Sequence, residues 1–190
     1  MYSITDEEFK HKYQTVFQSI FSLNAEFNDF WFQNSLSHRL LIYPQMFSLN
    51  NSQFSALAKA ASLHGETEFV LSISELFESK KTKHWLISLD DFHAYHSVKL
   101  NKMLENVIFS ISGNWGIRFT QDMFAIVAGS EPFLSNLVQQ WPEDFRNNIP
   151  NFLTDLKEDS SVNRVWLKAF LEHVCGKTQA QQFLLEFEFI

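Results

Sequence analysis

Cysteine, proline and glycine are scarce in this chain, and each shortage excludes a class of site. A single cysteine, Cys175, excludes a disulfide within the chain and argues against a zinc–thiolate site, which takes several cysteines. A phosphate-binding loop needs closely spaced glycines and a lysine at a helix start. Here Gly113, Gly116 and Gly129 are widely spaced, and the segment after Gly129 opens with a serine and a glutamate. A nucleotide-binding loop of that type is therefore excluded.

Basic residues are also few, and their shortage is uneven. The chain carries a net charge of −7, and residues 121–190 hold ten acidic against five basic side chains, a net charge of −5. Direct binding to nucleic acid requires the opposite sign, because lysine and arginine supply the affinity for phosphate. An acidic surface instead suits a basic protein partner, although an ordinary solvated surface would have the same composition.

Long apolar runs are absent as well. No segment approaches the roughly 20 apolar residues that a membrane-spanning helix needs. The first residues, MYSITDEEFKHKYQ, are acidic and do not have the apolar stretch of a secretory signal. The sequence therefore predicts a cytoplasmic protein with no membrane association.

Hydrophobic residues, by contrast, are plentiful, at 45% of the 190 residues, and 21 of them are phenylalanine. This length and composition predict one domain, residues 1–190, with a substantial core. Most of the aromatic rings should lie in that core, and a minority on a partner-binding surface.

The N-terminal part, about residues 5–34, is predicted to be helical. Thr5 and Glu8 have the spacing of a capping box, and apolar residues then recur at helical intervals through Phe21. The aromatic cluster from Phe27 to Phe32 is predicted to continue as helix after a break near Asn24.

An α/β core is predicted over about residues 38–141. Strands are expected at residues 38–43, 67–74, 84–89 and 123–128, with two more around a turn at Gly113 and Asn114. Helices are expected from residue 51 or 52 to Gly65, after a cap at Asp90, and from Ser130 to about residue 141.

The C-terminal extension, about residues 142–190, is again predicted to be helical, with segments at 145–156 and 162–175. The last eight residues, FLLEFEFI, alternate like a strand but could also end a helix. The predicted fold class is therefore α+β: a mostly antiparallel sheet of about four to six strands, with flanking helices and a helical C-terminal region.

No recognised catalytic motif is present, and no catalytic, cofactor-binding or metal-binding residue is predicted. His93 and His96 are three residues apart on an expected helix, and with His84 and either Asp90 or Asp91 they could form the site of an unrecognised enzyme. Surface histidines explain the same spacing more simply. Cys175 follows an apolar position near a helix C-terminus, where a thiolate is not stabilised, so a packed thiol is expected.

Two stretches carry a resemblance to a known group of proteins. SISGNWGIRFTQDMFAIVAGSEPFLSNL and the preceding ALAKAASLHGETEFVLS are similar to segments of a loose group of bacterial α+β proteins. The likeness covers roughly residues 54–141, and Ala128-Gly129 stands where that group has two glycines. Proteins of this kind resemble those encoded beside secreted polymorphic toxins, including contact-dependent growth inhibition systems. The resemblance implies an immunity role and supplies no catalytic residues.

The leading functional hypothesis is therefore a non-catalytic immunity protein that binds a cognate toxin domain. A basic nuclease is the expected toxin, because its groove for nucleic acid would complement an acidic surface. An adaptor or scaffold protein is a further alternative. The predicted partner-binding residues are the acids of the C-terminal third: Glu143, Asp144, Asp155, Glu158, Asp159, Glu186 and Glu188.

Overall fold

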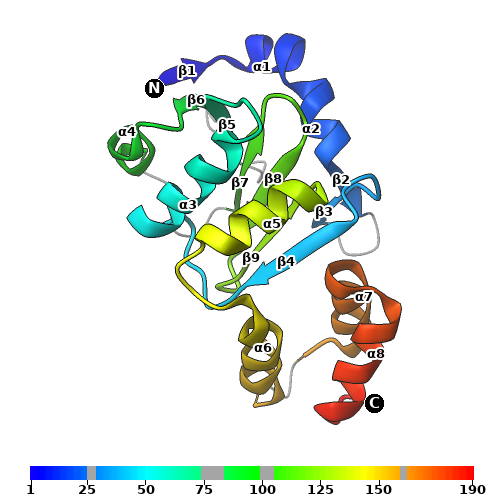
Figure 1. Ribbon diagram of the computed structural model, residues 1–190. Helices are drawn as coiled ribbons and strands as arrows, with labels where there is room; N and C mark the ends of the chain where they lie inside the picture. Colours follow the sequence, from blue (N-terminus) through cyan, green and yellow to red (C-terminus); the bar gives the residue numbers. More distant parts are fainter. Residues whose placement is uncertain (25–28, 74–83, 99–104, 159–161) are drawn as a thin grey trace.

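The computed structural model describes residues 1–24, 29–73, 84–98, 105–158 and 162–190, which form helices on both sides of a seven-stranded antiparallel sheet (Figure 1). The predicted α+β class is confirmed, with more strands than expected. The strands are β1 (Tyr2–Ile4), β2 (Phe21–Asn24), β3 (Asp29–Phe32), β4 (His38–Ile42), β5 (Glu68–Ile73), β6 (His84–Ser88), β7 (Asn106–Ser110), β8 (Trp115–Phe119) and β9 (Ala125–Gly129).

The helices lie before, between and after these strands. They are α1 (Asp6–Lys12), α2 (Gln14–Ile20), α3 (Asn51–Ser62), α4 (Phe92–Ser97), α5 (Glu131–Gln140), the 3₁₀ turn η1 (Phe145–Asn147), α6 (Asn148–Lys157), α7 (Arg164–Cys175) and α8 (Lys177–Glu186). No helix formed by the described part of the chain is long and apolar enough to cross a membrane.

The large sheet has the strand order β1-β6-β5-β7-β8-β9-β4, and every neighbouring pair in it is antiparallel. Strands β2 and β3 form a separate two-stranded hairpin. The edges of the large sheet are thus β1, which has three residues, and β4, which comes early in the chain but pairs with the late strand β9.

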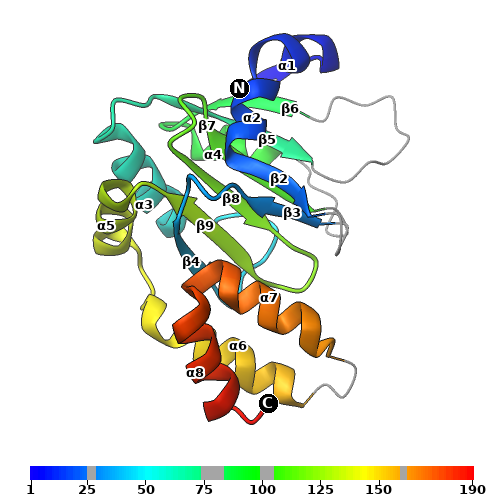
Figure 2. The same cartoon turned by 90° about the vertical axis from the view of Figure 1, so that its right-hand side faces the viewer.

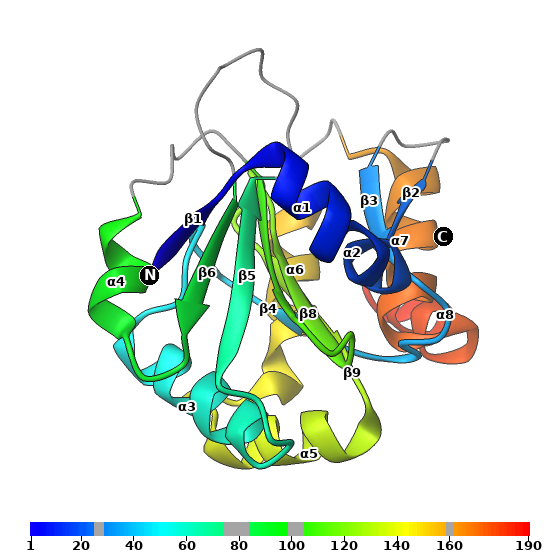
Figure 3. The same cartoon turned by 90° about the horizontal axis from the view of Figure 1, so that it is seen from above.

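Each face of the sheet is covered by its own hydrophobic core. Helices α3, α4 and α5 pack on one face, around Phe69, Trp115 and Phe133. On the other face lie α1, α2, the β2–β3 hairpin and α6 to α8, around Phe109, Phe124 and Phe170. Figures 2 and 3 show this three-layer arrangement from the side and from above. Because both faces are covered, all five residues of β7, β8 and β9 are buried.

The turn between β7 and β8 is anchored by a buried carboxyl group. Glu66 is 6% exposed and accepts hydrogen bonds from the hydroxyls of Ser110 and Ser112, at 2.6 and 2.7 Å, and from the indole N–H of Trp115 at 3.2 Å. Buried acceptors of this kind need such donors, because an unpaired polar group is costly away from water. The network fixes the predicted turn, in which Gly113 has a φ of 81°.

Gly116 lets the other layer approach the sheet closely. A Cβ atom at this position would lie 2.8 Å from both Ile20 Cγ2 and Phe21 Cζ, which is too short for real contacts. The end of α2 and the start of β2 therefore sit directly on β8. The neighbours that this glycine accommodates are thus α2 and the β2–β3 hairpin.

The predicted helix at residues 27–32 is wrong. Residues 29–32 form β3, which pairs with β2, while residues 27 and 28 lie outside the described residues. Pairing of the two aromatic segments buries Phe21 and Phe32 against the sheet. Strand β1, which precedes the N-terminal part, was not predicted from the sequence, and the helix that follows it is divided at Tyr13 into α1 and α2.

The strand interpretation of residues 183–190 is also wrong. Helix α8 runs to Glu186, and Phe187 forms its C-cap. Glu186 and Glu188 therefore do not share one face of a strand. The side chains of Ala180 and Leu184 are four residues apart and are both buried. This helical spacing favours a helix over the strand that the alternating residues at 183–190 suggested. A smaller correction concerns α4, which is capped by Asp91 instead of Asp90.

Candidate functional site

A groove of about 850 Å³ lies beside the edge strand β4, between the sheet and the C-terminal helices. One side is formed by α5 and the other by the end of α7 and by α8, and Phe145 and Ile149 also line the groove. In Figure 1, β4 runs along the lower edge of the sheet between α5 and α7. The volume of the groove is in the range of clefts that hold ligands or peptide side chains.

The floor of the groove includes the half-buried side chain of Arg39 on β4. Its guanidinium donates to two backbone carbonyls, that of His173 at 2.6 Å and that of Gln33 at 3.0 Å. Its Nε atom is buried and has no hydrogen-bond partner among the described residues. Burial without a carboxylate lowers the pKa of Arg39 from its usual value. Arg39 thus joins β4 to the end of α7.

His173 on α7 completes this junction as a neutral side chain. Its Nε2 atom accepts a hydrogen bond from the backbone N–H of Phe32 at 3.2 Å, so this nitrogen carries no proton. Burial, together with the positive charges of Arg39 and Arg118, lowers the pKa of His173 to about 3. A histidine that stays neutral over the physiological range and binds a backbone amide has a structural role.

Two carboxylates line the groove without a cationic partner among the described residues. Glu131 begins α5 and is exposed, whereas Glu172 lies in the last turns of α7 and is partly exposed. A negative side chain near a helix C-terminus is unfavourable, because the macrodipole places partial negative charge there. The groove also has an exposed apolar side chain, Val138, which is 45% exposed.

Cys175 lines the same groove and is a packed thiol, as the sequence predicted. Its side chain is half-buried and donates to the backbone carbonyl of Leu171 at 3.1 Å. Burial raises the pKa of this thiol to about 11, so it is not a reactive thiolate at neutral pH.

The predicted acids Glu143, Asp144 and Asp155 differ in their surroundings. Glu143 is exposed and accepts a hydrogen bond from the Gln53 amide at 3.4 Å. Asp144 forms a bidentate ion pair with Arg146, at 2.7 to 3.0 Å, which lowers the pKa of Asp144. Asp155 accepts a hydrogen bond of 2.5 Å from the Tyr43 hydroxyl.

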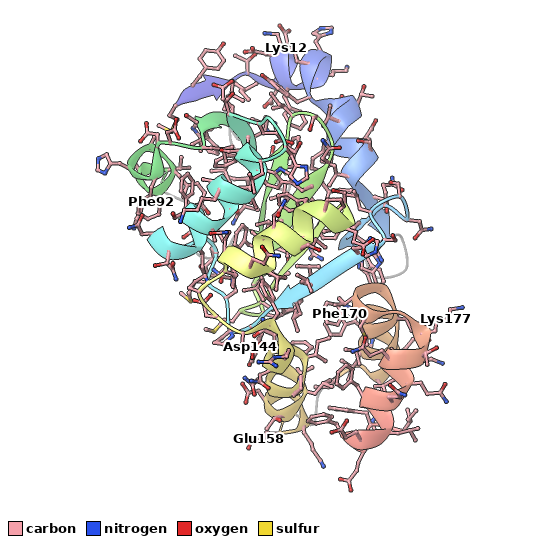
Figure 4. All side chains as sticks on the ribbon, viewed as in Figure 1. Lys12, Phe92, Asp144, Glu158, Phe170 and Lys177 are labelled. Atoms are coloured by element: carbon pink, nitrogen blue, oxygen red, sulfur yellow. The ribbon has the colours of Figure 1, made fainter. Side chains whose placement is uncertain are left out.

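The remaining predicted acids lie around the C-terminal helices. Glu158 is the C-cap of α6, and Figure 4 shows it and Asp144 at opposite ends of that helix. Glu188 pairs with Lys157 at 2.5 Å, whereas Glu186 ends α8 and is exposed. Asp159 lies outside the described residues. The structure therefore spreads these acids over several surfaces and neutralises two of them locally.

The three histidines of the enzyme hypothesis are not brought together. His84 is the first residue of β6, where its ring stacks on Phe9 at 3.8 Å and its Nε2 lies 3.7 Å from Asp6. His93 and His96 are exposed on α4, which follows the opposite end of β6. Among the described residues, no group of three or more His, Cys, Asp or Glu side chains is placed to hold a metal ion.

Apart from Cys175, the sequence did not single out the residues that form the groove. They come from β4, α5, α7 and α8, which are far apart in the chain and meet only because β4 pairs with β9. One local signal was available: Glu172 is an acid close to the predicted helix end at Gly176, where a basic residue is the usual choice.

Comparisons with protein-family models, with curated proteins and with solved structures found no match to this chain. The immunity role implied by the resemblance therefore stays a prediction.

Proposed function

We propose that this chain is an immunity protein: a cytoplasmic, non-catalytic domain that binds one toxin domain and blocks its activity. A basic nuclease domain is the partner that its charge fits best. The chain has a net charge of −7, and a nuclease must carry a basic surface to bind phosphate. Opposite charges on the two proteins would speed their association and favour the correct partner.

The observation that carries this proposal is the groove beside β4. It is open, partly apolar, and carries two carboxylates, Glu131 and Glu172, that have no cationic partner among the described residues. A partly apolar groove with carboxylates on its walls offers a partner both apolar contact and charge complementarity. Two side chains in the groove could be reactive in an enzyme, but here Cys175 is a packed thiol and His173 is a neutral imidazole.

Three of the predicted acids add exposed negative charge outside the groove. Glu143, Glu158 and Glu186 are exposed and form no ion pair among the described residues, so their charge is available to a partner. Asp144 and Glu188 contribute less, because Arg146 and Lys157 already neutralise them.

The proposal is tested by co-expressing the chain with the protein domain encoded directly upstream of its gene. We expect that domain to arrest growth when expressed alone, and we expect this chain to restore growth and to co-purify with it. Addition of the purified chain should stop cleavage of plasmid DNA or transfer RNA by the upstream domain. Complex formation should weaken as salt concentration rises, because salt screens surface charges.

A double substitution, Glu143→Lys with Glu158→Lys, should weaken the complex about ten-fold through charge reversal. The matched control, Glu7→Lys with Asp90→Lys, changes two exposed acids outside the C-terminal third and should leave affinity unchanged. An upstream gene that encodes no toxic domain, or a toxin that neither binds nor is inhibited, would contradict the proposal and favour an adaptor role.

A further inference from the structure

The backbone at the edge of β4 faces the groove. The carbonyl oxygen of Leu41 accepts a hydrogen bond from the Asn148 side chain at 2.8 Å, so it points away from β9. Backbone groups of alternate residues in a strand point the same way, and those of Arg39 therefore also face outward. Since β4 is an edge strand, no further strand of the described chain pairs with this side.

The walls of the groove fit one added strand. Helix α5 stands on one face of the sheet, with Val138 exposed and Ser135 beside it, and α7 and α8 stand on the other face, with Val174 and Phe183. A strand that entered between them would project alternate side chains toward the two walls. The carbonyl oxygen of Leu41 already accepts a hydrogen bond from Asn148. An added strand could therefore pair only with the segment from Ser37 to Leu40.

The charges of the groove indicate which kind of segment would bind there. Arg39 is engaged by two backbone carbonyls, and Arg146 is paired with Asp144. The carboxylates of Glu131 and Glu172, one on each wall, have no cationic partner among the described residues, and they outnumber the one lining cation that lacks a carboxylate, Arg39. An extended segment with lysine or arginine on both faces would satisfy both carboxylates, and its apolar residues would cover Val138 and Phe183.

We propose that the groove binds an extended, basic segment of the partner protein as an additional strand on β4. This inference rests on the proposed function, since it specifies how the toxin domain would be held. Strand addition obtains affinity from backbone hydrogen bonds, and side-chain contacts with the two walls supply the selectivity.

The first test uses a fluorescein-labelled peptide of about ten residues built from repeats of Lys-Lys-Val-Val, which places lysine and valine on both faces of a strand. Fluorescence anisotropy should report binding, and hydrogen exchange of the Arg39 amide should slow in the complex. A peptide of equal charge with prolines at its centre cannot pair as a strand and should bind at least about ten-fold more weakly. Equal binding of the two peptides would overturn strand pairing.

The second test changes the groove. Val138→Trp fills it with a large ring, and Glu131→Lys with Glu172→Lys reverses its charge; each should weaken binding of the Lys-Lys-Val-Val peptide about ten-fold or more. Val165→Trp is the matched control, because Val165 is 64% exposed on α7 and does not line the groove. Circular dichroism verifies that all variants are folded. Unchanged binding to the groove variants would contradict the proposal.

The inference and the proposed function fail in different ways. If a toxin domain binds wild type and Val138→Trp equally, the groove is not its docking site, although the immunity role stands. If the peptide binds as expected and no toxin domain binds the chain, the groove is a strand-binding site and the immunity role is wrong.

Discussion

At the scale of single residues, His173 and Arg39 join three separate segments of the chain. The His173 ring accepts from the backbone of β3, its carbonyl accepts from Arg39 on β4, and Arg39 also binds the segment at Gln33. The groups that face His173 are the backbone N–H of Phe32, the ring of Trp31 and the cations Arg39 and Arg118. Both cations oppose protonation of the imidazole.

This junction makes the stability of the fold sensitive to acid. The folded pKa of His173 is about 3, below its ordinary value of about 6.5, so between these values only the unfolded chain binds the proton. With respect to His173, the free energy of unfolding therefore has its full value above about pH 6.5. It falls as the pH is lowered below that value, by at most about 1.4 kcal/mol per pH unit from this group.

We expect His173→Gln to flatten this dependence, because glutamine does not titrate and keeps a carbonyl oxygen that can accept from Phe32. Urea denaturation of both proteins at pH 7 and pH 5 measures the difference. A wild-type stability that fell no more steeply than that of His173→Gln would show that His173 does not resist protonation.

At the scale of elements, the strands of the sheet were the most predictable part. Residues 106–129 fold as predicted because Gly113 and Ser130 mark the ends of strongly apolar segments. The same reasoning failed at Phe30 to Phe32, where an aromatic cluster fits a helix or a strand equally well and pairing with β2 decided the outcome. The groove as a whole could not be predicted, because its walls meet only through tertiary packing, although Glu172 near the helix end was a local signal.

The contact of α2 with β8 gives a prediction for Gly116. We expect Gly116→Ala to lower the free energy of unfolding by about 1–3 kcal/mol, because the new methyl group would overlap Ile20 and Phe21. Chemical denaturation measures the loss.

A double variant tests whether the loss of stability in Gly116→Ala comes from overlap with Phe21 or from another effect of the substitution. Phe21→Leu removes ring atoms near the new methyl group, so its combination with Gly116→Ala should cost less than the sum of the two single changes. Simple additivity would place the cause of any destabilisation somewhere other than this contact.

At the scale of the whole molecule, the C-terminal helices and the sheet share one hydrophobic core. Phe124 on the sheet side contacts Phe152 of α6 and Phe170 of α7, and the same cluster continues to Leu184 and Phe189. Phe189 is 6% exposed, and its carbonyl accepts from Arg164 at 3.1 Å. The end of the chain is thus packed into the core that supports β4.

Because this core is continuous, loss of Phe189 should destabilise the molecule as one unit. We expect Phe189→Ala to cost about 2–4 kcal/mol, with the helical and tryptophan signals lost in a single transition. Ile190→Ala is the control, because Ile190 is 62% exposed and should change stability by less than about 0.5 kcal/mol. Two separate transitions would mean that the C-terminal helices unfold independently of the sheet.

The recessed position of β4 also bears on self-association. An exposed sheet edge is a template for uncontrolled polymerisation, since each added strand presents a new edge to the next molecule. Here α5 and α7 flank the edge, and Asn148 blocks its end at Leu41, so a second intact sheet would collide with these helices before its strands could pair. A single flexible strand would fit, so this edge can accept a partner's strand without acting as a template for a second sheet.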